Sequence, residues 1–239
     1  MNLVIDIGNT LAKAAVVDCR EIIATYVAES LQQLPISQVV LEHGVHRSIL
    51  CTTRGCEAES THYVRQIVGH CLLLDENVQT PLRVEYSRQK LGKDRLAAAV
   101  GAFSLYNGSD LIIVDFGTAI TIDFVSAEGV FQGGFISPGV TTRLRSLHDY
   151  TATLPLCDPS KSVEGVAKCT EDAIVGGVIN GITYEIEGYI RRKKEEKCNF
   201  FVIFSGGDSI FFDKRIKNAI FADQYILFKG LDTILEYNA

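Results

Sequence analysis

Short apolar runs separated by turn residues mark the beginning of the chain. An apolar run that starts at Leu3 ends in Asp6-Ile7-Gly8-Asn9-Thr10, and β-branched stretches follow over residues 11–17 and 21–27. Runs of this length, bounded by turn residues, are typical of β-strands. The pattern predicts three consecutive strands and then a helix near residues 30–43.

The same arrangement occurs a second time. Residues 111–118 form another apolar run, which ends in Asp115-Phe116-Gly117-Thr118. Predicted strands over 119–125 and 129–136 follow it, and then a predicted helix near 140–150. A short motif alone is weak evidence, but the matching downstream elements indicate a duplicated unit.

The chain length and a turn-rich break predict where the two units meet. A chain of 239 residues suits two domains of about 100 to 130 residues each. The break at Tyr106-Asn107-Gly108-Ser109 predicts one domain over residues 1–106 and another over 107–239. The predicted class is α/β, with a mixed sheet and flanking helices in each domain and with the equivalent loops facing a common cleft.

Two further helices can be predicted. An alanine-rich stretch over residues 96–103 has strong helix propensity, which puts Asp94 and Arg95 at a helix start. Another helix is expected from Thr170, a natural N-cap residue, with apolar residues and glycines at three- and four-residue steps on one buried face. The mixed-charge run over 191–197 is typical of a solvated helix end. The glycines favour close approach of another helix, and one hypothesis is that this helix belongs to a second subunit.

Composition and charge narrow the class of function. Hydrophobic residues make up 47% and charged residues 22%, an ordinary globular mixture, and the formal net charge is -6. No extended basic stripe is present, so nucleic acid is not an expected partner. No apolar run approaches the roughly 18 residues of a membrane span, and no basic leader precedes the first strand, so we expect no membrane partner and a cytoplasmic location. Seven cysteines without CxxC spacing indicate reduced thiols rather than a metal site.

The two repeated loops suit a phosphate group. A glycine in a tight turn lets the backbone approach phosphate oxygens, while neighbouring hydroxyl and amide groups supply donors. The aspartates would repel phosphate and are better suited to Mg²⁺, a monovalent cation or their water molecules. Lys13 either reaches a terminal phosphate from the second strand or is a solvent-facing strand lysine, and the sequence leaves both open.

Asp94 and its neighbours form a second candidate site. Asp94 either complements the helix dipole or acts as a general base that orients a hydroxyl for phosphoryl transfer. Arg95 offers a fork for a substrate carboxylate, and Tyr86 offers a phenol for the same pocket. The alternatives are a surface ion pair for Arg95 and a core aromatic for Tyr86.

Together these motifs resemble a known family. The two loops are similar to those of the actin, hexokinase and heat-shock chaperone ATPases, which have ribonuclease H-like domains. A strand over 200–204 enters Ser205-Gly206-Gly207-Asp208, which resembles the adenosine-side loop of that fold or is a plain strand-to-helix turn. The ordered set DIGNT, LGKDR, DFGTA, GGFISPG and SGGD looks like a type III pantothenate kinase along nearly the whole chain. Ser205 stands where threonine is common in that family, and the chain is slightly short for it.

The resemblance implies a role for each matching residue. It implies that Asp94 is the catalytic base and that Asp115 binds a monovalent cation, K⁺ or NH₄⁺. The residues implied to bind ATP are Asp6, Ile7, Gly8, Asn9, Thr10, Leu11, Ala12, Lys13 and Thr118. The residues implied to bind pantothenate are Gly92, Lys93, Asp94, Arg95 and Thr170, and Tyr86 is a further candidate from its place beside them in the sequence.

The implied activity is transfer of the ATP γ-phosphate, with Mg²⁺, to the primary hydroxyl of pantothenate, the first step of coenzyme A biosynthesis. The resemblance also implies a homodimer. In each copy, ATP would lie between the two actin-like domains of the same chain. One alternative is another small-molecule kinase of the same fold, such as a sugar kinase, which a substrate panel would separate. The other is a nucleotide-binding regulator without catalysis, against which the intact Asp6, Asp94 and Asp115 argue.

Overall fold

The computed structural model describes residues 1–160, 165–196, 199–216 and 221–239. Cys198, one of the cysteines expected to be reduced, and Lys197 of the mixed-charge run lie outside the described residues. The chain divides into two compact units. Unit 1 holds Met1–Ser109, Phe124–Gly133 and Tyr225–Ala239, and unit 2 holds Asp110–Asp123 and Gly134–Gln224.

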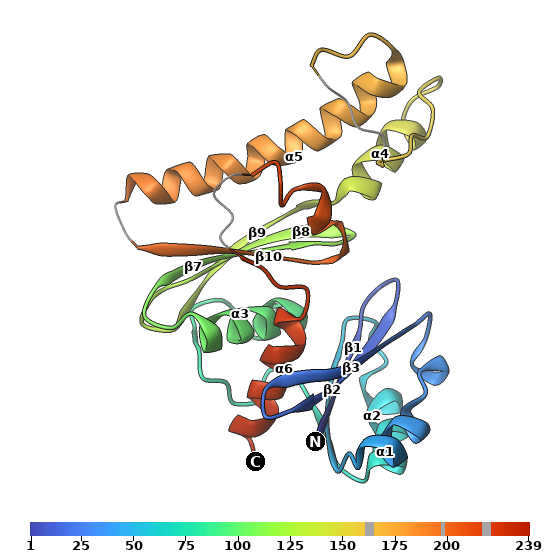
Figure 1. Cartoon of the computed structure of the whole chain (residues 1–239), viewed down its shortest axis with the longest axis vertical. Helices are drawn as coiled ribbons and strands as arrows, with labels where there is room; N and C mark the ends of the chain where they lie inside the picture. Colours follow the sequence, from blue (N-terminus) through green and yellow to red (C-terminus); the bar gives the residue numbers. More distant parts are fainter. Residues whose placement is uncertain (161–164, 197–198, 217–220) are drawn as a thin grey trace. The chain divides into compact units, whose positions relative to one another are not determined.

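An N-terminal sheet belongs to unit 1 (Figure 1). Its strand order is β3-β2-β1-β4-β5, with β1 antiparallel to β2 and parallel to β4. The strands are β1 (Asn2–Ile7), β2 (Ala12–Asp18), β3 (Glu21–Ala28), β4 (Arg47–Thr52) and β5 (Cys71–Leu73). The connecting helices are the short 3₁₀ helix η1 (Leu31–Gln33), α1 (Ile36–His43) and α2 (Glu57–Val68). Because β1 and β4 are parallel neighbours, the residues that follow them lie at the same edge of the sheet.

Two helices from opposite ends of the sequence also belong to unit 1. They are α3 (Lys93–Leu105) and α6 (Ile226–Tyr237). A Cβ atom at Gly101 would lie 2.0 Å from the Ile226 carbonyl oxygen, and one at Gly230 would lie 1.8 Å from the Ala97 carbonyl oxygen. Only glycine permits this backbone contact. The contact ties the C-terminal segment to the helix that begins beside Asp94.

A second sheet has the strand order β11-β10-β7-β8-β9-β6, with β7 parallel to β10. Its strands are β6 (Arg83–Val84), β7 (Asp110–Phe116), β8 (Ala119–Val125), β9 (Val130–Pro138), β10 (Phe200–Ser205) and β11 (Phe221–Ala222). The helices of unit 2 are α4 (Val140–Asp149), α5 (Thr170–Glu195) and the 3₁₀ helix η2 (Gly207–Phe211). The central strands β7 and β10 are buried apolar runs, as expected for parallel strands covered on both faces.

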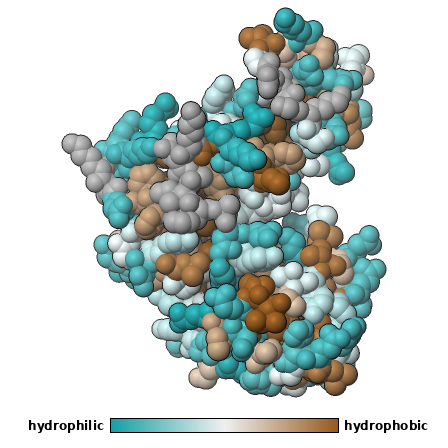
Figure 2. Space-filling model, in the orientation of Figure 1, coloured by the Kyte–Doolittle hydropathy of each residue, from teal (hydrophilic) through white to brown (hydrophobic). Residues whose placement is uncertain are grey.

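Each unit has an apolar interior. In unit 1, Leu3, Ile5 and Leu50 are fully buried in one cluster with residues of β2, α1 and α2. In unit 2, the Phe116 ring stacks on Phe212 with centroids 4.8 Å apart. On the face drawn in Figure 2, apolar residues occur as separate groups within a mostly hydrophilic surface. Burial of the interior apolar side chains stabilises each unit.

The predicted strands after each repeated motif are confirmed to within two residues as β2, β3, β8 and β9. The helix expected over 30–43 is split into η1 and α1 at Pro35, because proline disfavours helical backbone in the residue before it. The expectation that Thr170 is an N-cap is wrong, since Cys169 is the N-cap and Thr170 is the first residue of α5. The buried face of α5 includes Ile174, Val178 and Ile182 as expected, but Gly177 is exposed.

A single domain border after residue 106 stays a prediction. Unit 1 includes two segments, Phe124–Gly133 and Tyr225–Ala239, that this border assigns to the C-terminal domain.

Candidate functional site

The first repeated motif forms a tight turn between β1 and β2, which we call loop 1 (residues 8–11). The Gly8 N–H donates to the Leu11 carbonyl oxygen at 3.0 Å, so the turn itself uses the Gly8 amide. Asp6 lies opposite Lys13 in the antiparallel β1–β2 pair. Directly opposed residues share a face of the sheet, so Lys13 is a neighbour of Asp6 and lies close to loop 1, with its side chain partly exposed.

Cys51 lies on the other side of Asp6, in the parallel β1–β4 register. Its side chain is fully buried. Burial raises the pKa of the Cys51 thiol well above its usual value, and the negative charges of Asp6 and Asp94 and a hydrogen bond with Asp6 raise it further, against a smaller opposing effect of Lys93. A protonated thiol is the donor in that hydrogen bond. Cys51 therefore lies close enough to both carboxylates to feel their charge.

Asp94 lies in the first turn of α3, as predicted, with Gly92 as the N-cap. Its Oδ1 accepts a hydrogen bond from the Arg95 N–H at 2.8 Å. A Cβ atom at Gly92 would lie 2.5 Å from that same Oδ1, so glycine leaves room for the carboxylate. Local backbone contacts thus fix the orientation of Asp94.

Arg95 is buried, with 6% of its surface exposed, so the expected alternative of a surface ion pair is wrong. Its guanidinium carbon lies 5.6 Å from the Tyr86 ring centroid and 5.9 Å from that of Phe131. The two rings meet edge to face at 6.5 Å. Tyr86 is 38% exposed, so it is not a core aromatic. Such cation–π contacts hold a guanidinium in place. No local pattern in the sequence points to Phe131, which the β6–β9 pairing brings beside Tyr86.

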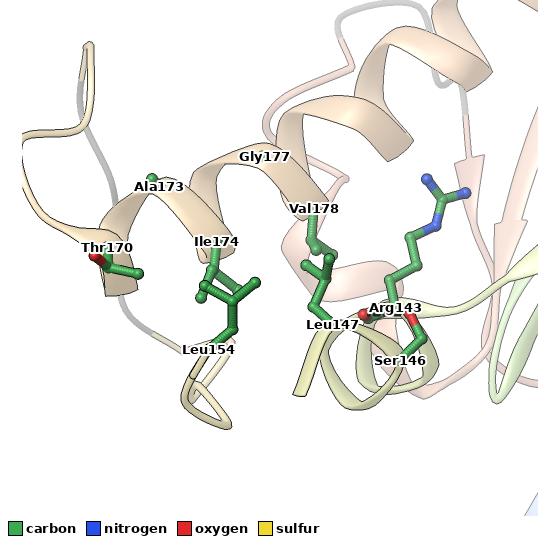
Figure 3. Close-up of a pocket in the computed structure, with 9 residues that line it drawn as sticks. All are labelled: Arg143, Ser146, Leu147, Leu154, Thr170, Ala173, Ile174, Gly177 and Val178. Atoms are coloured by element: carbon green, nitrogen blue, oxygen red, sulfur yellow. Dashed lines mark hydrogen bonds between the residues drawn. The ribbon is translucent and has the colours of Figure 1, made fainter. Parts of the chain in front are cut away.

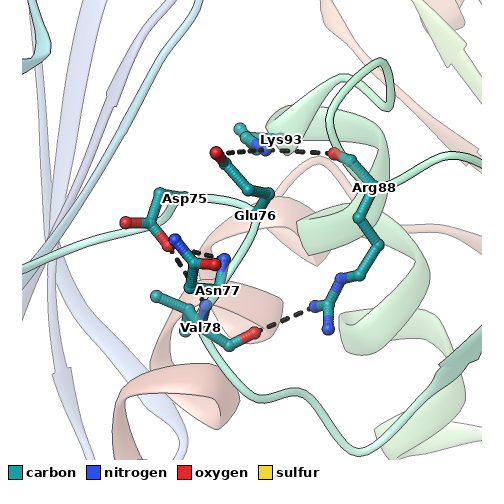
Figure 4. Close-up of polar contacts among 6 residues, drawn as sticks. All are labelled: Asp75, Glu76, Asn77, Val78, Arg88 and Lys93. Atoms are coloured by element: carbon teal, nitrogen blue, oxygen red, sulfur yellow. Dashed lines mark hydrogen bonds and ion pairs between the residues drawn. The ribbon is translucent and has the colours of Figure 1, made fainter.

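Lys93 is engaged with the segment that precedes α3 (Figure 4). Its Nζ donates to the Arg88 carbonyl oxygen at 3.2 Å and lies 3.8 Å from a Glu76 carboxylate oxygen. The Arg88 guanidinium in turn donates to the Val78 carbonyl oxygen at 2.9 Å. These contacts hold Lys93, the first residue of α3, against the segment that precedes the helix.

The second repeated motif forms a turn between β7 and β8, which we call loop 2 (residues 117–118), in unit 2. The Gly117 N–H donates to the Ala119 carbonyl oxygen at 3.1 Å. The Thr118 carbonyl oxygen accepts from the Gly139 N–H at 3.0 Å and from the Thr142 hydroxyl at 2.7 Å. Loop 2 is thereby fixed to the beginning of α4.

The Ser205-Gly206-Gly207-Asp208 segment joins β10 to η2 in unit 2. Ser205 lies beside Asp115 in the β7–β10 register. Gly206 has φ +88°, and a Cβ atom there would lie 2.3 Å from the Phe116 carbonyl oxygen, so glycine is required twice over. Burial raises the pKa of the Asp208 carboxyl. The segment is therefore packed directly against the strand that carries Asp115.

Thr170 lies in unit 2 at a cavity of about 500 Å³ between α4 and α5 (Figure 3). Ile174 and Val178 point from α5 toward Leu147 and Leu154, and Arg143 lies on α4. The cavity is lined by two hydroxyl side chains, Ser146 and Thr170, by Arg143 and by an apolar wall, a composition that small organic ligands favour.

The sequence-predicted site residues therefore fall into two groups. Unit 1 holds residues 6–13, Tyr86 and residues 92–95, and unit 2 holds Asp115, Thr118 and Thr170. Within the part of the chain that the structure describes, no cluster of three or more His, Cys, Asp or Glu side chains forms a ready-made metal site. None of the described helices has the length and apolar character of a membrane span.

Comparison with known proteins identifies the family to which this chain is similar. The sequence pattern of the family described as Type III pantothenate kinase matches residues 2–192. A Type III pantothenate kinase from Bacteroides fragilis (strain YCH46) is 39% identical over 240 residues, which cover 100% of this chain and 98% of the relative.

Two solved structures have a similar fold. One, named as a Baf family transcriptional activator from Campylobacter jejuni, matches with a TM-score of 0.66 at 24% identity, covering 99% of this chain and 98% of that chain. An archaeal actin homologue matches with a TM-score of 0.53 at 10% identity, covering 100% of this chain and 99% of that chain. These similarities confirm the predicted actin-like fold.

Proposed function

The chain belongs to the type III pantothenate kinases, which phosphorylate pantothenate in the first step of coenzyme A biosynthesis, and we propose how its residues divide that reaction. As a member of this kinase family it uses ATP and a small-molecule acceptor. The observation that carries the proposal is the position of the buried Cys51 on β4, which lies in register beside Asp6, while β4 also packs against α3, the helix with Asp94 in its first turn. Asp6 belongs to the proposed ATP site and Asp94 to the proposed acceptor site, so unit 1 supplies residues for both substrates.

Loop 1 binds the triphosphate in this proposal. The Gly8 amide is used within the turn, so we assign the amides of Asn9 and Thr10 and the Thr10 hydroxyl to phosphate oxygens. Lys13 adds a positive charge from β2. The other residues of 6–13 would contact ATP mainly through their backbone, and Thr118 of loop 2 would supply a further hydroxyl.

Asp94 orients the pantothenate hydroxyl and takes its proton as the hydroxyl oxygen bonds to the γ-phosphorus and the bond from that phosphorus to the departing ADP breaks. Because Oδ1 already accepts the Arg95 N–H, we assign Oδ2 to the hydroxyl. The Arg95 guanidinium, held by Tyr86 and Phe131, would pair with the pantothenate carboxylate. Gly92 and Lys93 would shape the pocket beside them.

The donors present fit Mg²⁺ and a monovalent cation, K⁺ or NH₄⁺. Mg²⁺ commonly takes one or two protein carboxylates together with substrate phosphates and water. Asp6 offers a carboxylate beside loop 1, and Asp115 offers one beside loop 2. Bound there, the cations would neutralise phosphate charge.

A homodimer and a cytoplasmic location complete the proposal. The exposed Gly177 and the apolar cavity between α4 and α5 support a second copy packing there, with Thr170 at the acceptor. The use of ATP as a substrate supports the cytoplasmic location.

An ADP-release assay with the Asp94→Asn variant tests the proposal. We expect turnover to fall by about 10² to 10⁴-fold, because the base is lost, while the Kd for ATP stays within about twofold. Glu57→Gln is the matched control, since Glu57 is an exposed acid in the first turn of α2 and tests the helix-dipole effect alone. Near wild-type turnover in Asp94→Asn would remove Asp94 as the base.

A panel of acceptors tests the rival functions in the same assay. ADP release with pantothenate and not with hexoses is the expected result. Release with hexoses would favour a sugar kinase, and ATP binding without release to any acceptor would favour a regulator.

A further inference from the structure

Arg54, in the segment after β4, reaches back to loop 1. Its Nε donates to the Gly8 carbonyl oxygen at 2.6 Å, and its Nη2 donates to the Asn9 carbonyl oxygen at 3.0 Å. Its Nη1 lies 3.5 Å from the Glu29 carbonyl oxygen. One guanidinium therefore contacts two consecutive carbonyls of loop 1 and also the carbonyl of Glu29, the residue that follows β3.

The residue before Arg54 makes a similar contact. The Thr53 N–H and hydroxyl both donate to the Ile7 carbonyl oxygen, at 3.1 and 3.3 Å. Together, Thr53 and Arg54 bind three consecutive carbonyl oxygens, those of residues 7 to 9. Because β4 is the parallel neighbour of β1, the chain leaves β4 at the edge where loop 1 begins.

The geometry of the peptide bond gives these contacts a consequence. In a trans peptide, the C=O of one residue and the N–H of the next point in opposite directions within one plane. The Gly8 carbonyl shares its peptide plane with the Asn9 N–H, and the Asn9 carbonyl shares its plane with the Thr10 N–H. Binding both carbonyls to Arg54 therefore turns both amides away from the guanidinium.

We propose that Arg54 is a positioning residue for ATP, which holds the Gly8 and Asn9 carbonyls so that the Asn9 and Thr10 amides point toward the phosphates. This inference rests on the proposed assignment of loop 1 to ATP. A carbonyl turned toward the triphosphate would repel it, and the planar fork of an arginine suits two adjacent acceptors in a way that a lysine ammonium does not.

The test uses steady-state kinetics and ATP titration of Arg54→Met and Arg54→Lys in the full chain. For Arg54→Met we expect the KM and Kd for ATP to rise about tenfold, since hydrogen bonds from a charged group are lost, with kcat and the KM for pantothenate within about twofold. Arg54→Lys keeps the charge but not the fork, so its KM for ATP should also rise, by about threefold or more.

Arg65→Met is the matched control. The Arg65 guanidinium also donates two hydrogen bonds to a backbone carbonyl, at 3.1 and 3.0 Å, but it lies on α2 and its acceptor is Cys71 of β5 rather than a residue of loop 1. A loss of thermal stability without a change in the KM for ATP is expected from Arg65→Met. The same result from Arg54→Met would overturn the proposal, and so would full recovery in Arg54→Lys or a fall in kcat at constant KM.

An Asp6→Asn variant separates this inference from the proposed function. If Asp6→Asn weakens ATP binding but Arg54→Met does not, loop 1 remains the ATP site and Arg54 does not position it. If neither variant changes ATP binding, the assignment of loop 1 to ATP fails, and the role of Arg54 fails with it.

Discussion

Loop 1 and loop 2 have the same sequence motif but are held by different kinds of contact. Loop 1 is held by a long side chain, the Arg54 guanidinium, which binds two of its carbonyls. Loop 2 is held by backbone and a short hydroxyl, the Gly139 N–H and Thr142, which share one carbonyl. The exposed Arg54 side chain must lose its own rotamer freedom to hold loop 1, whereas the Gly139 backbone is already ordered as the N-cap of α4. We therefore expect loop 1 to be the more adaptable of the two.

The aspartates before the loops have similar neighbours. In the parallel strand next to each one, a small polar side chain lies in register, Cys51 beside Asp6 and Ser205 beside Asp115. Both of these neighbours are buried. A thiol and a hydroxyl can each donate to a carboxylate, but the hydroxyl is the stronger donor. The two copies of the duplicated unit thus have a polar neighbour at the same position beside the aspartate, but this neighbour is a thiol in the first copy and a hydroxyl in the second.

The largest expected effect comes from adding a methyl group at Gly139, where the backbone contacts loop 2. A Cβ atom at Gly139 would lie 2.0 Å from the Gly117 carbonyl oxygen, a backbone atom that cannot rotate away. Gly139→Ala should therefore displace loop 2 and lower kcat/KM by about 100-fold or more. Steady-state kinetics and thermal unfolding check this.

Gly188→Ala is the control for Gly139→Ala. A Cβ atom at Gly188, within α5, would meet nothing within 4 Å. Alanine has the higher helix propensity, so this variant should keep its activity and gain up to about 1 kcal/mol of stability. Wild-type kinetics in Gly139→Ala would show that loop 2 does not need its backbone contact.

A moderate effect is expected when the neighbour of Asp6 is changed. Cys51→Val removes the donor to Asp6 at similar volume, and we expect kcat/KM to fall about tenfold, the change that corresponds to one hydrogen bond to a charged group. Cys51→Ser copies the pairing of Ser205 with Asp115 and should stay within about threefold of the wild type. Equal losses in the two variants, measured by ADP release, would show that packing rather than donation matters at this position.

The sequence predicted those features that depend on local pattern. The strands after each motif follow from apolar periodicity, and Asp94 at a helix start follows from the alanine-rich stretch that comes after it. These signals lie within a few residues of the feature they predict, so one sequence was sufficient.

Other features depend on strand neighbours and register, which one sequence does not specify. Cys51 lies beside Asp6 only because β4 pairs with β1 in parallel, and Arg54 reaches loop 1 for the same reason. Phe131 meets Tyr86 through the β6–β9 pairing. Single polar or aromatic residues of this kind have no local motif, so their roles could not be predicted from one sequence.

The smallest expected effect concerns the other end of the strand that leads to loop 1. At the start of β1, the Asn2 amide donates to the Asp232 carboxylate of α6 at 2.8 Å, and Asp232 is 3% exposed. The corresponding end of β7 has an ion pair instead, with Lys193 Nζ 3.0 Å from an Asp110 carboxylate oxygen. The first strand is thus anchored by a buried acid and an amide, and the second by opposite charges.

This difference predicts a pH dependence for the first anchor. Burial raises the pKa of Asp232, and the charge of Glu236 adds to the effect, against the hydrogen bond from Asn2 and two arginines. A carboxyl with a raised pKa binds its proton more tightly in the folded state, so its contribution to stability is present below about pH 3.8 and is lost as pH rises through the folded-state pKa.

Asp232→Asn keeps an acceptor for Asn2 and removes the charge. Its Tm should therefore exceed that of the wild type by up to about 2 °C at pH 7, with the difference shrinking toward pH 4. A Tm below that of the wild type at pH 7, with a deficit that shrinks as pH falls, would mean that the ionised Asp232 stabilises the fold, and that both strands are anchored by charge.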